Sequence, residues 1–407
     1  MNKLIALLVC CSCLYMNVQP FRLYFDGGQA LSMFIPTLII LVYDKLWGNK
    51  SIIYAILYTI IVFSLRSLDV EYFNNYLSQI MSMFFSICCI EHFFKHKDLF
   101  FAKSVLLVYY GSLIIMALIS IPQFYLFPDM TRELLFAENA GTRIASRFYW
   151  SIAYSSMHEI PLLLIPLVAI YKSTGDKMRR FVLLISIIIL YVALMLGDAT
   201  TPLLLATCII FVLILYKKSH SISYNLKRLA LISACLFCVL NKYILIFILS
   251  TIQPIFEGTT NYKKIDDSIN QIVFEQVEEN SNLGQRDLVY TKSKEVFFSH
   301  PFGIEEDINK IGMHSFIIDH LAVLGLILII PLVILTIQRY KIIILRLKYF
   351  KYYYIVCYIS FILMASFKNF FLKIDAWFIV PLLLLTLETY RVNKLKNKQN
   401  EYCNKKN

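Results

Sequence analysis

The sequence predicts an all-α polytopic membrane protein, and three observations lead to that fold class. Of the 407 residues, 58% are apolar and 16% are charged, and the mean hydropathy is +0.65, a balance that a water-soluble domain does not show. The apolar residues form runs of about 20, the length that a helix needs to cross a hydrocarbon core of ~30 Å. The runs lack the alternation of a membrane barrel, so helices are the structure that pairs their backbone groups within lipid.

About twelve transmembrane helices are predicted, and the third, eighth and eleventh are short enough that their ends are uncertain. The first could instead be a cleaved signal, because Cys10 follows an apolar run. Val9 stands where processing requires a small residue, which favours a first span. In order, the predicted spans cover 3–18, 28–46, 51–66, 76–94, 101–121, 151–171, 180–197, 201–216, 228–250, 315–337, 350–366 and 374–391.

The basic residues indicate the orientation. With the N-terminus in the cytoplasm, 25 of the 39 Lys and Arg residues fall in inside segments and 13 in outside segments, and Lys242 lies within a span. Six of those 13 lie in one long loop, where the positive-inside rule carries little weight. Both termini are therefore expected to face the cytoplasm. Basic loops facing an anionic leaflet also account for the net charge of +12 without nucleic-acid binding.

The spans form a single integral membrane domain over residues 1–407, with two sizeable outside loops at 122–150 and 251–313. The second loop is long enough to fold as short helices over the bundle, and long loops are often functional. It holds eleven acids against six bases. Any binding of an anionic group there must therefore depend on individually placed arginines.

Residues 284–328, GQRDLVYTKSKEVFFSHPFGIEEDINKIGMHSFIIDHLAVLGLIL, resemble the membrane-embedded O-antigen polymerase and ligase superfamily. Members have a long periplasmic loop with a central Arg, a His/Asn-Pro-x-Gly turn, and a His-Ser or His-Asn pair that enters a span continuing toward Gly. An earlier stretch, AGTRIASRFYWSIAYS at 140–155, is similar to the family's first outside loop. The matching residues are Arg286, the turn His300-Pro301-Phe302-Gly303, His314-Ser315, Gly325, Arg143 and Arg147.

The resemblance implies a metal-independent glycosyl transfer from an undecaprenyl-diphosphate-linked oligosaccharide in the bilayer. The leaving diphosphate needs fixed cations, and Arg286, Arg143 and Arg147 are the candidates because a planar guanidinium grips two oxygens. His314 is the candidate base, since imidazole titrates near ~6.5. Each of these arginines could instead pair with a loop acid, and His314 could instead satisfy a backbone group. A chain-length regulator is a further partner that this function allows.

Three other polar residues are candidates for lining a substrate cavity. On a continuous helix, Asp319 lies about 140° around from His314 but shares a face with Ser315, four residues back. His320 lies ~9 Å further along than His314 at 1.5 Å per residue, where burial favours its neutral form. Lys242 could face a diphosphate within the bundle, or it could snorkel to the interface.

The resulting function is a polymerase of O-antigen or capsule repeat units at the outer face of a bacterial inner membrane. The alternative within the family is a ligase that transfers glycan to lipid A core. A different class is a lipid-linked oligosaccharide flippase, which the span count fits but the long loop and missing repeat symmetry disfavour. No metal site is expected, because the outside loops hold no Asp-x-Asp motif and their acid clusters fit a solvated face.

Overall fold

The computed structural model of the protein is all-helical over its described residues, which contain no β-strand, and this confirms the all-α part of the predicted fold class. Lys242, Arg143, Arg147 and His314 lie outside the described residues. The residues that the structure describes are 1–18, 21, 28–65, 70–127, 152, 154–197, 200–216, 224, 250–251, 253–257, 262, 265–266, 269–270, 282–303, 315–368 and 373–404.

The first five long helices follow the first five predicted spans. Helix α1 packs against both α6 and α3, and α3 packs against α5. Helices α5 and α6 extend beyond the apolar runs that predicted them. The bounds are α1 (Asn2–Asn17), α3 (Gly28–Tyr43), the short η1 (Leu46–Gly48), α4 (Lys50–Leu65), α5 (Val70–His96) and α6 (Leu99–Leu126).

The middle of the chain forms a group of helices in which α9, α10 and α11 pack on one another, and α10 also contacts α6. The predicted span 151–171 is interrupted, because the short α8 ends before Glu159 and α9 begins after it. The bounds are α8 (Tyr154–Met157), α9 (Ile160–Ser173), α10 (Lys177–Leu196), α11 (Thr200–Leu215) and the short η2 (Gln253–Phe256).

The C-terminal part adds one helix from the long loop and then the last helices of the bundle. The span predicted at 374–391 begins with a π-helical turn, η4, and its α-helix continues well past the apolar run. The bounds are α15 (Asn282–Ser299), α16 (Phe316–Leu328), α17 (Ile330–Arg346), α18 (Lys351–Phe367), η4 (Asp375–Ile379) and α19 (Val380–Asn404).

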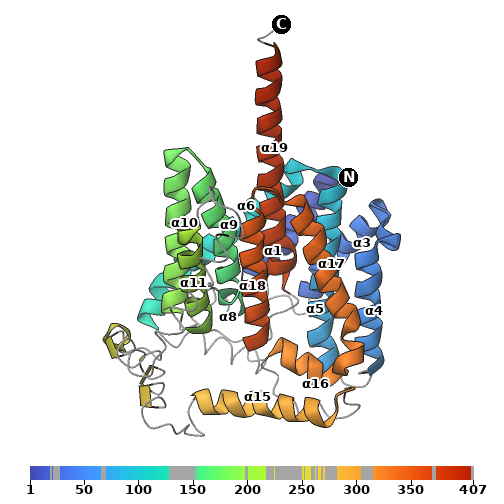
Figure 1. Ribbon diagram of the computed structural model, residues 1–407, viewed down its shortest axis with the longest axis vertical. Helices are drawn as coiled ribbons and strands as arrows, with labels where there is room; N and C mark the ends of the chain where they lie inside the picture. Colours follow the sequence, from blue (N-terminus) through green and yellow to red (C-terminus); the bar gives the residue numbers. More distant parts are fainter. Residues whose placement is uncertain are drawn as a thin grey trace.

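Figure 1 shows the long helices standing roughly side by side, with α15 lying across one end of the bundle. Helix α16 lies beside α15 at that end, and the two are in contact. The C-terminal part of α19 projects from the opposite end, and the N-terminus lies toward that end as well. Helix α15 and the two ends of the described chain are therefore separated along the axis of the bundle.

Side-chain caps begin several helices at the positions where their first N–H groups lack partners. Asp98 accepts hydrogen bonds from the N–H groups of Phe100 and Phe101 at 2.8 and 3.1 Å, which starts α6. Asp176 starts α10 in the same way through Met178 N at 3.0 Å. Glu388 of α19 accepts from Tyr349 N at 2.8 Å just before α18, so a buried carboxylate ties these two helices.

The prediction of one continuous span at 315–337 is wrong. Helices α16 and α17 are separated by Ile329 and bent by 103° relative to each other. Gly325 within α16 has φ 66° and ψ −176°, which interrupts the helix before the bend. Helix α17 stands with the upright helices while α16 lies across the end of the bundle (Figure 1).

Two described helices, α6 and α10, are individually long and apolar enough to cross a membrane, and α16 with α17 makes a third if the bent pair is one span. Six other described segments are apolar but shorter than 18 residues. These observations support a membrane protein by length and composition. The total of about twelve spans stays a prediction, and the span at 228–250 lies outside the described residues apart from Ser250.

Candidate functional site

The turn His300-Pro301-Phe302-Gly303 ends helix α15 and reverses the chain. His300 N donates to Val296 O at 2.9 Å, and Gly303 N donates to His300 O at 2.9 Å, which closes the turn. Gly303 has φ 102°, a conformation that residues with a Cβ rarely adopt. The Pro-x-Gly pattern in the sequence is thus explained by the geometry of a tight turn.

This turn packs directly against Gly325 in α16. Leu326 N donates to Pro301 O at 3.0 Å, which joins the two backbones. A Cβ atom on Gly325 would lie 2.2 Å from the carbonyl carbon of Phe302, and one on Gly303 would lie 2.7 Å from Val323 O. Two glycines 22 positions apart in the printed numbering therefore allow one backbone contact, which no larger residue permits.

Asp319 fastens the start of α16 to α15. Its Oδ1 accepts from Ser293 Oγ at 2.6 Å, and its Oδ2 accepts from Ser315 N at 2.9 Å. Ser315 caps the helix through Ile318 N at 3.3 Å, and Phe316 N donates to Lys368 O at 3.2 Å, at the end of α18. Asp319 and Ser315 are both buried. The chain entering α16 is therefore held from α15, from α16 itself and from α18.

His320 lies in the same helix with its own set of contacts. Its ring stacks on Phe316 with the centroids 3.6 Å apart, and Nδ1 donates to Phe316 O at 2.9 Å. The side chain is buried, at 5% exposure. His320 therefore packs along its own helix, and a role in lining a substrate cavity stays a prediction.

The rotation count from His314 to Asp319 is wrong. Ser315 has an extended backbone, with φ −118° and ψ 119°, and α16 begins only at Phe316. A continuous helix therefore does not run through Ser315, so the count gives no reason to separate Asp319 from His314. The shared face of Asp319 and Ser315 is realised instead as a hydrogen bond to the Ser315 backbone.

The structure describes the backbone of only one of the other predicted site residues. Arg286 lies in the first turns of α15, and its side chain is not described. His314, Arg143, Arg147 and Lys242 lie outside the described residues. Their roles stay predictions. The described residues on either side of His314, the turn at 300–303 and Ser315, are both held by the contacts above.

A second polar cluster, which sequence reasoning missed, joins α6, α9 and η4. Tyr109 Oη donates to Asp375 Oδ1, and Lys373 Nζ lies 3.8 Å from Glu159 Oε1. Asp375 interacts electrostatically with both Glu159 and Lys373. Asn17 Nδ2 donates a hydrogen bond to the backbone carbonyl oxygen of Tyr109 at 2.9 Å. Two buried carboxyl groups, one phenol and one ammonium therefore share one site in the bundle.

The polar cluster occurs where the chain leaves regular α-helix. Asp375 begins the π-helical turn η4, and Glu159 lies between α8 and α9. Departures of this kind are often found at functional sites. Glu159 lies within the predicted span at 151–171, but the other members of the cluster come from distant parts of the chain. Tyr109 and Asp375, for example, are 266 positions apart. Only the packing brings them together.

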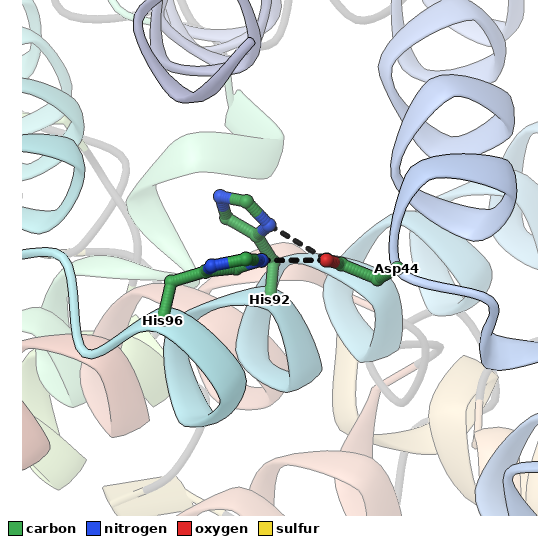
Figure 2. A group of neighbouring side chains, drawn as sticks. All are labelled: Asp44, His92 and His96. Atoms are coloured by element: carbon green, nitrogen blue, oxygen red, sulfur yellow. Dashed lines mark hydrogen bonds and ion pairs between the residues drawn. The ribbon is translucent and has the colours of Figure 1, made fainter.

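A third cluster lies at the end of the bundle that carries the termini. His92 Nδ1 lies 2.7 Å from Asp44 Oδ2, and His96 Nε2 lies 2.6 Å from Asp44 Oδ1 (Figure 2). Lys95 Nζ donates to Asp44 O at 2.8 Å. The one sequence signal for this cluster is the spacing of the two histidines, four apart on one face of α5.

The Asp44 cluster has the residue types of a metal site, because its three ligand atoms lie within 4.8 Å of one another. Both carboxylate oxygens, however, already accept a histidine at hydrogen-bond distance, and the Lys95 ammonium lies 3.7 Å from Oδ1. Those contacts describe a buried ionic hydrogen-bond cluster that fastens the end of α3 to α5.

The architecture and these sites define an all-α protein with helices long and apolar enough to cross a membrane. Scanned against models of protein families, the chain matches none, and a search of curated proteins also finds no match.

Proposed function

We propose that the protein polymerises lipid-linked oligosaccharide repeat units of an O-antigen or capsular polysaccharide. It does so at the outer face of a bacterial inner membrane, as a multi-pass glycosyltransferase with about twelve spans and both termini in the cytoplasm. The observation that carries the proposal is the backbone contact between the turn at 300–303 and Gly325. These are the residues on which the family resemblance rests, and a local coincidence of letters would not require them to meet.

The position of this contact supports the proposed sidedness. Helices α15 and α16 lie at the end of the bundle opposite the C-terminal helix α19 (Figure 1). In the predicted orientation that end faces the periplasm, where the lipid-linked units are joined.

The proposed reaction forms one glycosidic bond and breaks one bond to phosphate. A hydroxyl of the acceptor repeat unit attacks the anomeric carbon of the donor, and His314 takes the hydroxyl proton. The bond from that carbon to the diphosphate oxygen breaks, and undecaprenyl diphosphate leaves with the bonding electrons. Arg286, Arg143 and Arg147 stabilise the charge on the leaving oxygens, in a metal-independent reaction.

Asp319 is a positioning residue in this proposal. It holds Ser315 N and Ser293 Oγ together, at 2.9 and 2.6 Å, and so fixes the residue that directly follows His314. A base must lie within hydrogen-bond reach of the proton that it takes, so the backbone at its position matters. Lys242 and His320 belong to the proposed lining of the substrate path.

Deletion of the gene followed by gel display of surface glycan tests the proposed function. Loss of a polymerase leaves lipid A core bearing one repeat unit. Bare core would indicate a ligase, and undecaprenyl-linked units trapped inside would indicate a flippase. Either of those two results overturns the proposal.

Point variants test the site. His314→Ala and Arg286→Ala are each expected to abolish chain extension with normal abundance in the membrane. Lys294→Ala is the matched control, because Lys294 is an exposed cation on the same helix as Arg286. Wild-type glycan lengths from both site variants would show that the assignment is wrong.

A further inference from the structure

Arg339 is a buried cation in the middle of α17, with 3% of its surface exposed. In the orientation predicted from the sequence, Arg339 is one of the 25 basic residues of the inside segments, because the predicted span ends at Ile337. The bend between α16 and α17 changes that assignment. Helix α17 begins at Ile330, and Arg339 lies ~10 Å before the end of this helix at 1.5 Å per residue.

The guanidinium of Arg339 has a partner on one side only. Nη1 donates to Glu91 Oε1 of α5, while Nε and Nη2 have no hydrogen-bond partner among the residues that the structure describes. Nη1 is by convention the nitrogen cis to Cδ, so Nε–H and Nη2–H point in parallel from the same edge. That edge is the one that grips two oxygens of a carboxylate or phosphate at once. Leaving such donors buried and unpaired is unfavourable, because they have lost their hydrogen bonds to water.

Arg339 lines a pocket between α17, α18 and η4. The other walls are mainly aromatic and include Tyr340, Tyr354, Tyr358, Phe361 and Trp377. The pocket is partly open to its surroundings, and its cavity volume is about 20 Å³. A ligand that fits has an oxyanion for the guanidinium edge and an apolar part for the aromatic walls.

The end of α17 nearest the pocket is basic. Lys341, Arg346 and Lys348 are exposed there, and the Arg346 guanidinium lies 3.7 Å from the ring centroid of Phe94. Exposed basic residues next to a bilayer attract anionic headgroups. Glu91 already balances the single positive charge of Arg339. The exposed cations therefore supply the attraction for a negatively charged ligand.

The geometry points to a binding site for an anionic phospholipid, whose phosphate accepts hydrogen bonds from Nε and Nη2 of Arg339 and whose acyl chain lies along the aromatic walls. This site is independent of the proposed polymerase reaction. It lies on α5, α17, α18 and η4, whereas the residues of the family resemblance lie on α15, on α16 and in the outside loops.

Retention of lipid by the purified full-length protein tests the site. The protein is delipidated in detergent, given phosphatidylglycerol or phosphatidylcholine, and measured by native mass spectrometry. Wild type is expected to retain phosphatidylglycerol at least about 10-fold better than phosphatidylcholine. Millimolar inorganic phosphate is expected not to displace the lipid. Displacement by phosphate would overturn the assignment to a lipid.

The variants are chosen to keep the buried charges balanced. The double variant Glu91→Gln/Arg339→Gln removes both charges together, which avoids an unpaired buried ion. It is expected to retain phosphatidylglycerol at least about 10-fold less well than wild type, whereas Glu91→Gln alone is expected to keep or strengthen that retention by freeing Nη1. Arg180→Gln is the matched control, because Arg180 is an exposed arginine of α10 that does not line the pocket, with an expected loss of less than about 2-fold. Unchanged retention by the double variant would overturn the proposal.

Discussion

Gly325 shows how a single residue decides the end of the bundle where α15 and α16 meet. Its φ of 66° and the 2.2 Å approach that a Cβ would make to Phe302 leave room for no side chain. The carbonyl of Pro301 is then free to accept from Leu326 N. The break in α16 and the position of the 300–303 turn therefore depend on the same glycine.

Gly325→Ala is expected to destabilise the protein by at least about 2 kcal/mol, through backbone strain and overlap with the turn. Thermal unfolding of the purified protein in detergent measures the effect. Gly111→Ala is the control, because a Cβ there meets nothing within 4 Å and α6 gains a better helix former. Equal melting temperatures for the two variants would contradict this account of Gly325.

The Asp44 cluster is a second case in which one side chain holds two elements together. One carboxylate accepts from His92 and His96 of α5 and follows directly on α3 (Figure 2). The Asp44 and His92 side chains have no exposed surface, so solvent cannot replace the lost contacts.

Asp44→Leu is expected to destabilise the protein by about 3–5 kcal/mol, because it leaves buried histidines without the carboxylate that pairs them. Asp176→Asn is the control, since Asn caps a helix about as well as Asp and Asp176 is exposed. Unfolding in denaturant gives both values. A destabilisation below 1 kcal/mol for Asp44→Leu would mean that the cluster does not hold α3 to α5.

At the scale of elements, a buried polar contact joins α15 to α16. Ser293 lies on α15, Asp319 lies on α16, and their hydrogen bond of 2.6 Å is buried. The same carboxylate binds Ser315 N, so the join also defines where α16 begins.

Asp319→Asn is expected to change stability by less than about 1 kcal/mol, because its amide can donate to Ser293 Oγ while its oxygen accepts from Ser315 N. Asp319→Leu cannot do either and is expected to lose about 2–4 kcal/mol. Thermal unfolding separates the two. Chain extension measured on the stable Asp319→Asn variant then reports whether the negative charge itself matters. A large loss of stability in Asp319→Asn would contradict the expectation that its amide replaces both hydrogen bonds.

At the scale of the whole molecule, the arrangement separates the end that carries α15 from the end that carries the C-terminal part of α19, and the proposed function places the first end in the periplasm. Helix α15 crosses one end of the bundle, and α19 leaves from the other (Figure 1). The distribution of the 39 basic residues predicts which end faces the cytoplasm.

Reporter fusions test that orientation. Alkaline phosphatase fused after Ser299 is expected to be active, because it folds only outside the cytoplasm, and the same fusion after Thr174 is expected to be inactive. A green fluorescent protein fused after Asn407 is expected to be fluorescent. The reverse pattern would place the termini outside and would remove the sidedness on which the proposed function depends.

Much of the helical fold could be predicted from the sequence. The runs at 3–18, 51–66 and 350–366 became α1, α4 and α18 with ends within a few residues. Composition and run length suffice for this, because every backbone polar group in lipid must be paired within its own helix.

The candidate sites divide differently. Arg286, His314, Arg143 and Arg147 were predicted from the family resemblance, and their roles stay predictions, because His314, Arg143, Arg147 and the side chain of Arg286 lie outside the described part of the structure. Tyr109 with Asp375 and Arg339 with Glu91 could not be found in this way. Those pairs are separated by 266 and 248 positions, and no local pattern connects residues that meet only through packing.

The sequence by itself therefore determined the helical class and the positions of most of the described helices, and its resemblance to a family led to the residues proposed for glycosyl transfer. The tertiary structure decided that the run at 315–337 bends by 103°, that Asp319 ties α15 to α16, and that Arg339 is buried beside an aromatic pocket. The physical reason is the distance along the chain over which each interaction acts. Hydropathy and helix formation act between near neighbours in the chain, whereas the contact of Gly325 with the 300–303 turn and the buried charges depend on partners from other parts of the chain.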